Sequence, residues 1–165
     1  MPYRTKTYIA AEWDGDEEAV KKLREWNDGE YWSLSFTDAH DLTQARDSSL
    51  YCSIKKSLKM RLNVSKTFVL IVGRNTRSVR KGSCQYCGSY DSRTCSADYR
   101  SYIEYECDYA VRNALNIVVL YNAATVDKSR CPDVVKDIGY HAPMQQMYYG
   151  SHRWDYQSVK KAMEQ

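Results

Sequence analysis

The chain has 165 residues, of which 43% are hydrophobic and 27% charged, the composition of an ordinary globular domain. Its net charge of +3, from 24 basic and 21 acidic residues, is too balanced for a nucleic-acid partner, which needs a concentrated basic face. No apolar run approaches a membrane span, and the polar first seven residues do not resemble a signal peptide. We therefore expect a cytoplasmic protein without a membrane partner.

The first part of the chain predicts alternating strands and helices. An apolar strand at Thr7–Ala11 precedes a helix that we expect Asp16 to cap and Asn27–Gly29 to end. The alternating aromatic segment Tyr31–Phe36 predicts a second strand. A second amphipathic helix is predicted next, with an apolar stripe and four basic residues that lie off this stripe. The stripe is Leu50, Ile54, Leu58 and Leu62, and the basic residues are Lys55, Lys56, Lys59 and Arg61.

The middle of the chain contains the strongest strand pattern. Thr67–Gly73 is apolar, rich in β-branched residues and ended by glycine, which is typical of a parallel strand covered on both faces. We expect a long loop over 74–98, a helix over 99–114 and a further strand at Asn116–Tyr121.

The remainder predicts a short helix around Val134–Ile138, an edge strand within His141–Tyr148 and a closing helix at Trp154–Met163. Strands and helices thus alternate from end to end, which favours an α/β fold with a central parallel sheet of about five strands. We expect one domain over 1–165, with a cysteine-rich loop insertion at about 77–98.

The carboxyl ends of the strands predict where a site would lie, because ligands of open parallel sheets bind there. Trp13 offers a stacking surface, Asp14 and Asp38 offer acceptors for sugar hydroxyls, and Arg74 offers a phosphate partner. The glycine patterns of tightly held dinucleotides and of P-loop ATPases are both missing from the sequence. A nucleotide is therefore expected as a transient substrate, with no permanent cofactor.

Four segments, in their order and spacing over roughly residues 7–122, resemble the bacterial TIR-like family that includes the TIR proteins of Thoeris antiphage defence. They are Tyr8–Asp14, Ser33–Asp38, Phe68–Thr76 and Tyr102–Glu106. The resemblance implies a flavodoxin-like three-layer sandwich. It also implies an enzyme that cleaves NAD and turns the ADP-ribose part into a messenger, which activates a separate effector protein.

In such enzymes a glutamate on the helix before the fourth strand is catalytic, and the resemblance places Glu106 there, with Glu104 as the alternative. Breaking the nicotinamide–ribose bond builds oxocarbenium character, which a nearby carboxylate stabilises. Because Glu104 and Glu106 are two residues apart on a helix, only one of them can face the site. Tyr102 or Tyr105 is expected to line it.

The cysteines allow a structural alternative. Cys84, Cys87, Cys95 and Cys107 could together hold a structural zinc ion, although packing is the more ordinary role for Cys107. His40 is a weaker neighbour of the predicted site.

Two other functions fit the sequence. The 15 tyrosines would suit a non-catalytic module that docks onto other TIR-like domains, in a homo-oligomer or a mixed assembly. The second of these functions is that of a flavodoxin-like electron carrier.

Overall fold

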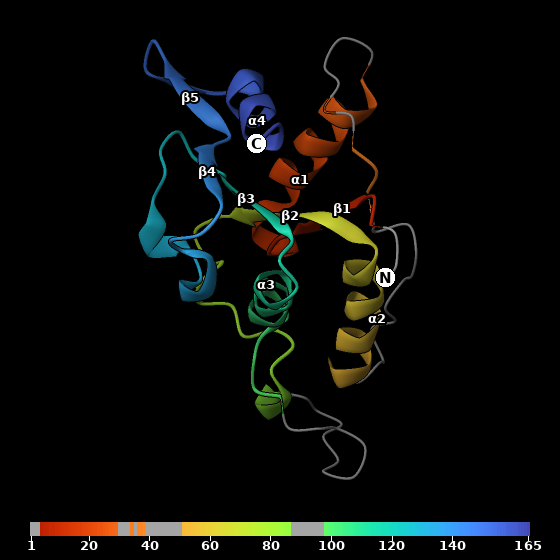
Figure 1. Ribbon diagram of the computed structural model, residues 1–165. Coiled ribbons are helices and arrows are strands. Elements are labelled where there is room, and N and C mark those ends of the chain that lie inside the picture. The colour runs from red at the N-terminus through yellow and green to blue at the C-terminus, as the bar shows by residue number, and fades with distance from the viewer. Residues whose placement is uncertain (1–3, 30–33, 35, 39–50, 87–97) are drawn as a thin grey trace.

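A parallel sheet forms the centre of the computed structural model, which describes residues 4–29, 34, 36–38, 51–86 and 98–165 (Figure 1). Its strands are β1 (Lys6–Ala10), β2 (Ser65–Val72), β3 (Asn116–Tyr121) and β4 (Tyr140–Pro143). They lie in the order β1-β2-β3-β4, and each neighbouring pair is parallel. The predicted parallel α/β sheet is confirmed, with four strands among the described residues instead of about five.

Helices cover both faces of this sheet, as Figure 1 shows. Helices α1 (Trp13–Asp28) and α4 (Tyr156–Met163) pack on one face, against strand residues such as Ile9. Helices α2 (Tyr51–Asn63) and α3 (Tyr102–Arg112) pack on the other face, against residues such as Tyr8. Because successive strand residues point to opposite faces, one apolar strand supplies both cores.

The predicted second strand, Tyr31–Phe36, is described only at Leu34 and Phe36, and neither of these residues is in a strand. The Asn27 side chain donates to the Phe36 carbonyl at 2.8 Å and accepts from its N–H at 2.9 Å, so Phe36 is held at the end of α1. Parallel pairing begins later, where Asp38 forms an isolated bridge with Thr7. Asp38 therefore lies beside the amino end of β1, whereas we expected it beyond the carboxyl end of a strand; most of Tyr31–Phe36 lies outside the described residues.

The start of α1 also differs from the prediction. Glu12, not Asp16, is the N-cap, and its side chain accepts from the N–H groups of Asp14 and Gly15. Asp16 instead sits inside the helix with non-helical angles (φ −119°, ψ 18°). This kink fixes the direction in which the first turn, with Trp13 and Asp14, leaves β1.

The last third contains more strand than the sequence predicts. The expected edge strand at His141–Tyr148 divides into β4 and β5 (Gln145–Tyr148), and β5 forms an antiparallel hairpin with β6 (Ser151–Trp154). Short 3₁₀ turns occupy Cys84–Tyr86, Lys128–Arg130 and Asp133–Val135. The predicted closing helix is confirmed as α4. It begins at Tyr156, because Trp154 is the last residue of β6. Among the described residues no helix has both the length and the apolar character needed to cross a membrane.

Candidate active site

A cavity of about 470 Å³ opens beyond the carboxyl end of β1, between α2 and α3. Its volume is in the range of small-molecule sites. Most of its lining comes from the end of β1, from α2 and from the start of α3. The lining residues are Tyr8, Ala11, Glu12, Trp13, Asp14, Tyr51, Ile54, Leu58, Arg61, Val79, Lys81, Tyr102, Ile103 and Glu106. Four of the residues singled out from the sequence, Trp13, Asp14, Tyr102 and Glu106, thus share one cavity.

Glu106 reaches this cavity from the buried face of α3. Ile103, Cys107 and Ala110 lie on the same face, at the three- and four-residue spacing of a core-facing helix stripe. Glu106 is 6% exposed. A carboxylate within an apolar stripe is unusual, because burial of an ionised group is costly unless it has partners.

Glu104 has a different task at the start of the same helix. Its backbone N–H donates to the Ser101 hydroxyl at 3.2 Å, and its carboxylate accepts from the Ser101 N–H at 2.8 Å. This reciprocal pair is a capping box, which satisfies donors that the first helical turn leaves open. The structure therefore places Glu106, and not Glu104, in the cavity.

The turn at Lys81 and Gly82 is held close to the start of α3 by its glycine. Gly82 has φ +98°, and a Cβ there would lie 2.4 Å from the Tyr102 ring. The Tyr102 N–H donates to the Lys81 carbonyl at 2.9 Å. The close approach brings Lys81 and Tyr102 into the same cavity wall.

Two partners from other elements reach the Glu106 carboxyl. The Tyr8 side chain on β1 hydrogen-bonds it, and the Arg61 guanidinium on α2 lies near enough to favour its charge. Burial outweighs both and raises the pKa of Glu106 to about 8. Burial, and then the Glu106 charge, raise the pKa of Tyr8 well above its usual value, so the phenol stays protonated and acts as the donor.

Arg61 and Lys55 correct the predicted solvent face of α2. Both are buried, with Arg61 7% and Lys55 3% exposed. Lys55 Nζ donates to the Arg100 carbonyl at 2.5 Å and to the Asp98 carbonyl at 3.2 Å, which ties α2 to the segment leading into α3. Helix α2 therefore contacts the segment before α3 as well as the sheet. Its apolar stripe predicts the contact with the sheet but not the contact with this segment.

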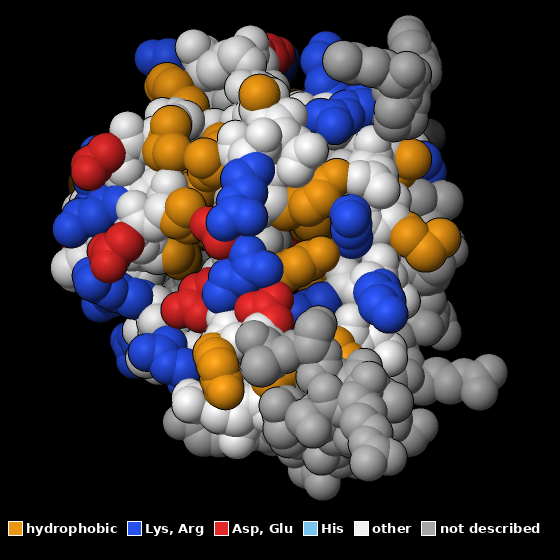
Figure 2. Space-filling view, turned by 60° about the horizontal axis from the view of Figure 1, so that its bottom comes forward, with side chains coloured by type: hydrophobic (Ala, Val, Ile, Leu, Met, Phe, Trp, Pro, Cys, Tyr) orange, Lys and Arg blue, Asp and Glu red, His pale blue; other side chains and the backbone are white. Residues whose placement is uncertain are grey.

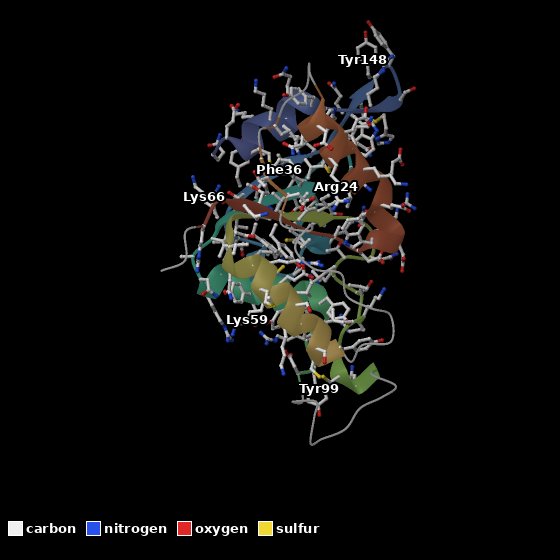
Figure 3. The ribbon with its side chains drawn as sticks, turned by 90° about the vertical axis from the view of Figure 1, so that its right-hand side faces the viewer. Arg24, Phe36, Lys59, Lys66, Tyr99 and Tyr148 are labelled. Atoms are coloured by element: carbon white, nitrogen blue, oxygen red, sulfur yellow. The ribbon has the colours of Figure 1, made fainter. Side chains whose placement is uncertain are left out.

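Trp13 connects the cavity to Asp38 through Arg24. The Arg24 guanidinium lies 5.1 Å from the centre of the Trp13 ring, and its Nε donates to the Asp38 carboxylate at 3.0 Å. Figure 3 shows Arg24 and Phe36 on the α1 side of the sheet, opposite the α2 residue Lys59. Asp38 does not line the cavity, and this contact links it to the cavity wall.

Two further residues expected at the site do not line the cavity. Arg74 is exposed in the turn after β2. Tyr105 instead forms cation–π contacts, with the Arg100 guanidinium at 5.0 Å and Lys55 Nζ at 5.8 Å from its ring centre. Sequence reasoning missed Tyr8 and Arg61, and the signal for Tyr8 was its place on the same strand face as Ala10.

The cysteines that the structure describes lie in separate clusters. Cys107 is in the core that contains Cys131, whereas Cys84 packs against Cys52. Within 4–29, 34, 36–38, 51–86 and 98–165, no group of three or more His, Cys, Asp or Glu side chains could hold a metal ion. Cys87, Cys95 and His40 lie outside the described residues.

A second cleft, of about 390 Å³, borders α3 and is lined by charged residues that pair with one another. Arg100 bonds Asp108 at 2.6 Å, and Arg77 bonds Asp133 at 3.1 Å. Figure 2 shows acidic and basic side chains next to one another on the α2–α3 side of the molecule. Because these charges compensate each other, the first cavity is the stronger candidate for a ligand.

A parallel sheet between two helical layers, with a ligand-sized cavity at its carboxyl edge, is consistent with a flavodoxin-like α/β fold of the TIR-like kind. The family model of the Thoeris protein ThsB, TIR-like domain, matches residues 8–81, just under half of the chain. Over these residues the chain is therefore similar to the TIR-like domain of the Thoeris protein ThsB, in agreement with the resemblance seen in the sequence segments. No curated protein matches the chain.

The matched range covers part of the cavity only. It contains β1, α1, α2 and β2, with the lining residues from Tyr8 to Lys81. The match ends before α3 and does not include Glu106. Any role for Glu106 therefore rests on its position in the cavity and not on the family match.

Proposed function

We propose that this protein is an NAD-cleaving enzyme of Thoeris antiphage defence that produces an ADP-ribose-derived signalling molecule. The observation that carries the proposal is the position of Glu106, a buried carboxyl in the same ligand-sized cavity as the indole of Trp13. NAD is a substrate in this proposal, and no permanent cofactor is required.

The cavity contains the groups that the reaction needs. When the C1′–N bond of NAD breaks, its electron pair goes to the nicotinamide nitrogen, and positive charge develops on the ribose. An ionised Glu106 stabilises that charge, and water or a group of the substrate itself then bonds to C1′. Trp13 offers a surface for a planar ring, while Arg61 and Lys81 supply positive charge for the diphosphate.

We further propose that the whole chain acts as one TIR-like unit in the cytoplasm and that it works in a homo-oligomer or an assembly with other TIR-like domains. Its messenger would diffuse to a separate effector protein. Neither nucleic acid nor a membrane takes part. A structural zinc ion remains an additional proposal for the loop that contains Cys87 and Cys95.

Nicotinamide release from NAD tests this function. Purified protein is incubated with NAD over a range of protein concentrations, because an enzyme that needs assembly becomes active only at high concentration. We expect Glu106→Ala to keep the fold and to abolish release. Glu104→Gln is the matched control, since it changes a neighbouring carboxylate outside the cavity and should retain activity. Equal release by Glu106→Ala and the unchanged protein would exclude Glu106.

A second candidate, a non-catalytic interaction module, is favoured by the β5–β6 hairpin. Three consecutive large side chains are exposed there, Met147, Tyr148 and Tyr149, and Tyr149 is 92% exposed at the turn. Exposed aromatic residues of this kind are enriched in protein interfaces. Sedimentation of the protein and of Tyr149→Ser tests this role: loss of self-association without loss of nicotinamide release would show that docking and catalysis are separate.

A further inference from the structure

Tyr8 is held in β1, a different element from the helix α3 that carries Glu106. It is 1% exposed, and its ring stacks on that of Phe68 in the neighbouring strand, with centroids 6.0 Å apart. Its hydroxyl forms a hydrogen bond with the Glu106 side chain. The direction of this bond is therefore set by β1 and β2, which restricts the orientations open to the carboxyl group on α3.

Three effects act on the Glu106 charge, and two of them come from groups on other elements. Burial in the core disfavours the ionised form, whereas the hydrogen bond from Tyr8 and the positive charge of Arg61 favour it. With a pKa of about 8 only a minority of Glu106 is ionised at pH 7, and without these two partners that fraction would be smaller still. The ionised carboxylate that the proposed chemistry uses therefore depends on residues outside α3.

Other titratable residues lie near Glu106, on α3 and around the cavity. Burial raises the pKa of Tyr105 and Cys107 on α3, so both stay neutral near pH 7. Glu12 and Asp14 line the cavity from the end of β1 and carry the same sign of charge as Glu106, while Lys81 lines it from the turn before α3. Tyr8 thus donates a hydrogen bond to this carboxyl from a neighbouring strand and favours its ionised form.

We propose that Tyr8 is a positioning residue for Glu106, whose hydroxyl orients the carboxyl group and favours its ionised form inside the core. The consequence for catalysis rests on the proposed function. The control of Glu106 by Tyr8 does not, and it can be measured in the resting protein.

The experiment compares Tyr8→Phe with the matched control Tyr121→Phe. Both substitutions remove one hydroxyl from a buried ring, but the Tyr121 hydroxyl bonds His141 at 2.8 Å and lies away from the cavity lining. Protein labelled with ¹³C at the glutamate side-chain carboxyls is titrated by NMR, and Glu106 is assigned by the signal lost in Glu106→Gln. We expect Tyr8→Phe to move the Glu106 midpoint upward by about one pH unit, and Tyr121→Phe to leave it in place.

Turnover provides the second readout. At pH 7, Tyr8→Phe should lower kcat about tenfold, because a smaller fraction of Glu106 is ionised, and should change KM by less than about twofold. The deficit should shrink as the pH approaches 9.5. If Tyr8→Phe does not fold, Arg61→Gln is titrated instead, and the same upward shift is expected because it removes the other group that favours the charge.

The two proposals fail in different ways. An unchanged Glu106 midpoint in Tyr8→Phe, or an equal loss of kcat at every pH, would overturn the positioning role even in an active enzyme. A shifted midpoint without any nicotinamide release would leave the positioning role intact and count against NAD cleavage.

Discussion

The Nε atom of Arg24 donates a hydrogen bond of 3.0 Å to the carboxylate of Asp38. The same guanidinium lies 5.1 Å from the centre of the Trp13 ring, so it links a residue of the cavity wall to the segment that follows α1. Because Arg24 occupies part of the Trp13 surface, the ring is held in place while its remaining surface stays available to the cavity.

Trp13→Ala is expected to weaken substrate binding more than catalysis. Loss of a stacking surface costs about 1–3 kcal/mol, so KM for NAD should rise roughly 5- to 150-fold with a smaller change in kcat. Trp13→Phe should recover part of the loss. Steady-state kinetics of nicotinamide release measure both constants. Trp13 is 39% exposed, so an unchanged melting temperature is the control, and an unchanged KM would contradict stacking at this residue.

Glu106 is expected to make stability fall as the pH rises. Its pKa is about 8 in the folded protein against 4.5 for the unperturbed group, so between these values the folded state binds more protons than the unfolded state. The free energy of unfolding should therefore decrease across this window, by on the order of 5 kcal/mol in total.

Urea unfolding at several pH values measures this slope. Glu106→Gln should reduce it and should be more stable than the unchanged protein above pH 8, while losing nicotinamide release. Glu104→Gln is the control: the glutamine side chain can still accept the Ser101 N–H and keep the capping box, and the slope should stay unchanged. A Glu106→Gln protein with the original slope would show that another group titrates in this range.

Gly73 and Asp16 are expected to be energetically coupled. A Cβ at Gly73 would lie 2.0 Å from Asp16 Oδ1, and Asp16 accepts a hydrogen bond of 2.9 Å from Asn122. Gly73→Ala should therefore destabilise the protein by about 1–3 kcal/mol through overpacking. In Asp16→Ala the space is free, so adding Gly73→Ala should cost less. Denaturant unfolding of both single variants and the double variant gives the coupling, and simple additivity would contradict the predicted clash.

Lys55 is expected to stabilise the entry to α3. Lys55→Met would leave the carbonyls of Asp98 and Arg100 without this donor and remove the ion pair with Asp98, at a cost of about 2–3 kcal/mol in unfolding free energy. Lys56→Met is the matched control on the exposed side of the same helix and should change stability by less than about 0.5 kcal/mol. Equal effects of the two variants would contradict a special role for Lys55.

Segments with strong local patterns were predictable. The apolar run of β2 and the stripe of α3 each appear in the structure where the sequence placed them. The rule that sites lie beyond the carboxyl ends of parallel strands selected Trp13 and Asp14, both of which line the cavity. It did not bring Asp38 to the cavity, because Asp38 bridges Thr7 near the amino end of β1, and the register of a strand is not encoded in its own alternation.

By itself, the sequence determined the strands and helices with strong patterns, since hydrophobic periodicity acts over a few neighbouring residues. It left open whether Glu104 or Glu106 faces the site, and the structure shows Glu106 on the buried face of α3 with Ile103 and Ala110. Only the tertiary structure decided what meets that carboxyl group. Tyr8 and Arg61 reach it from other elements, and contacts between distant segments depend on how the sheet and helices pack, which no local pattern specifies.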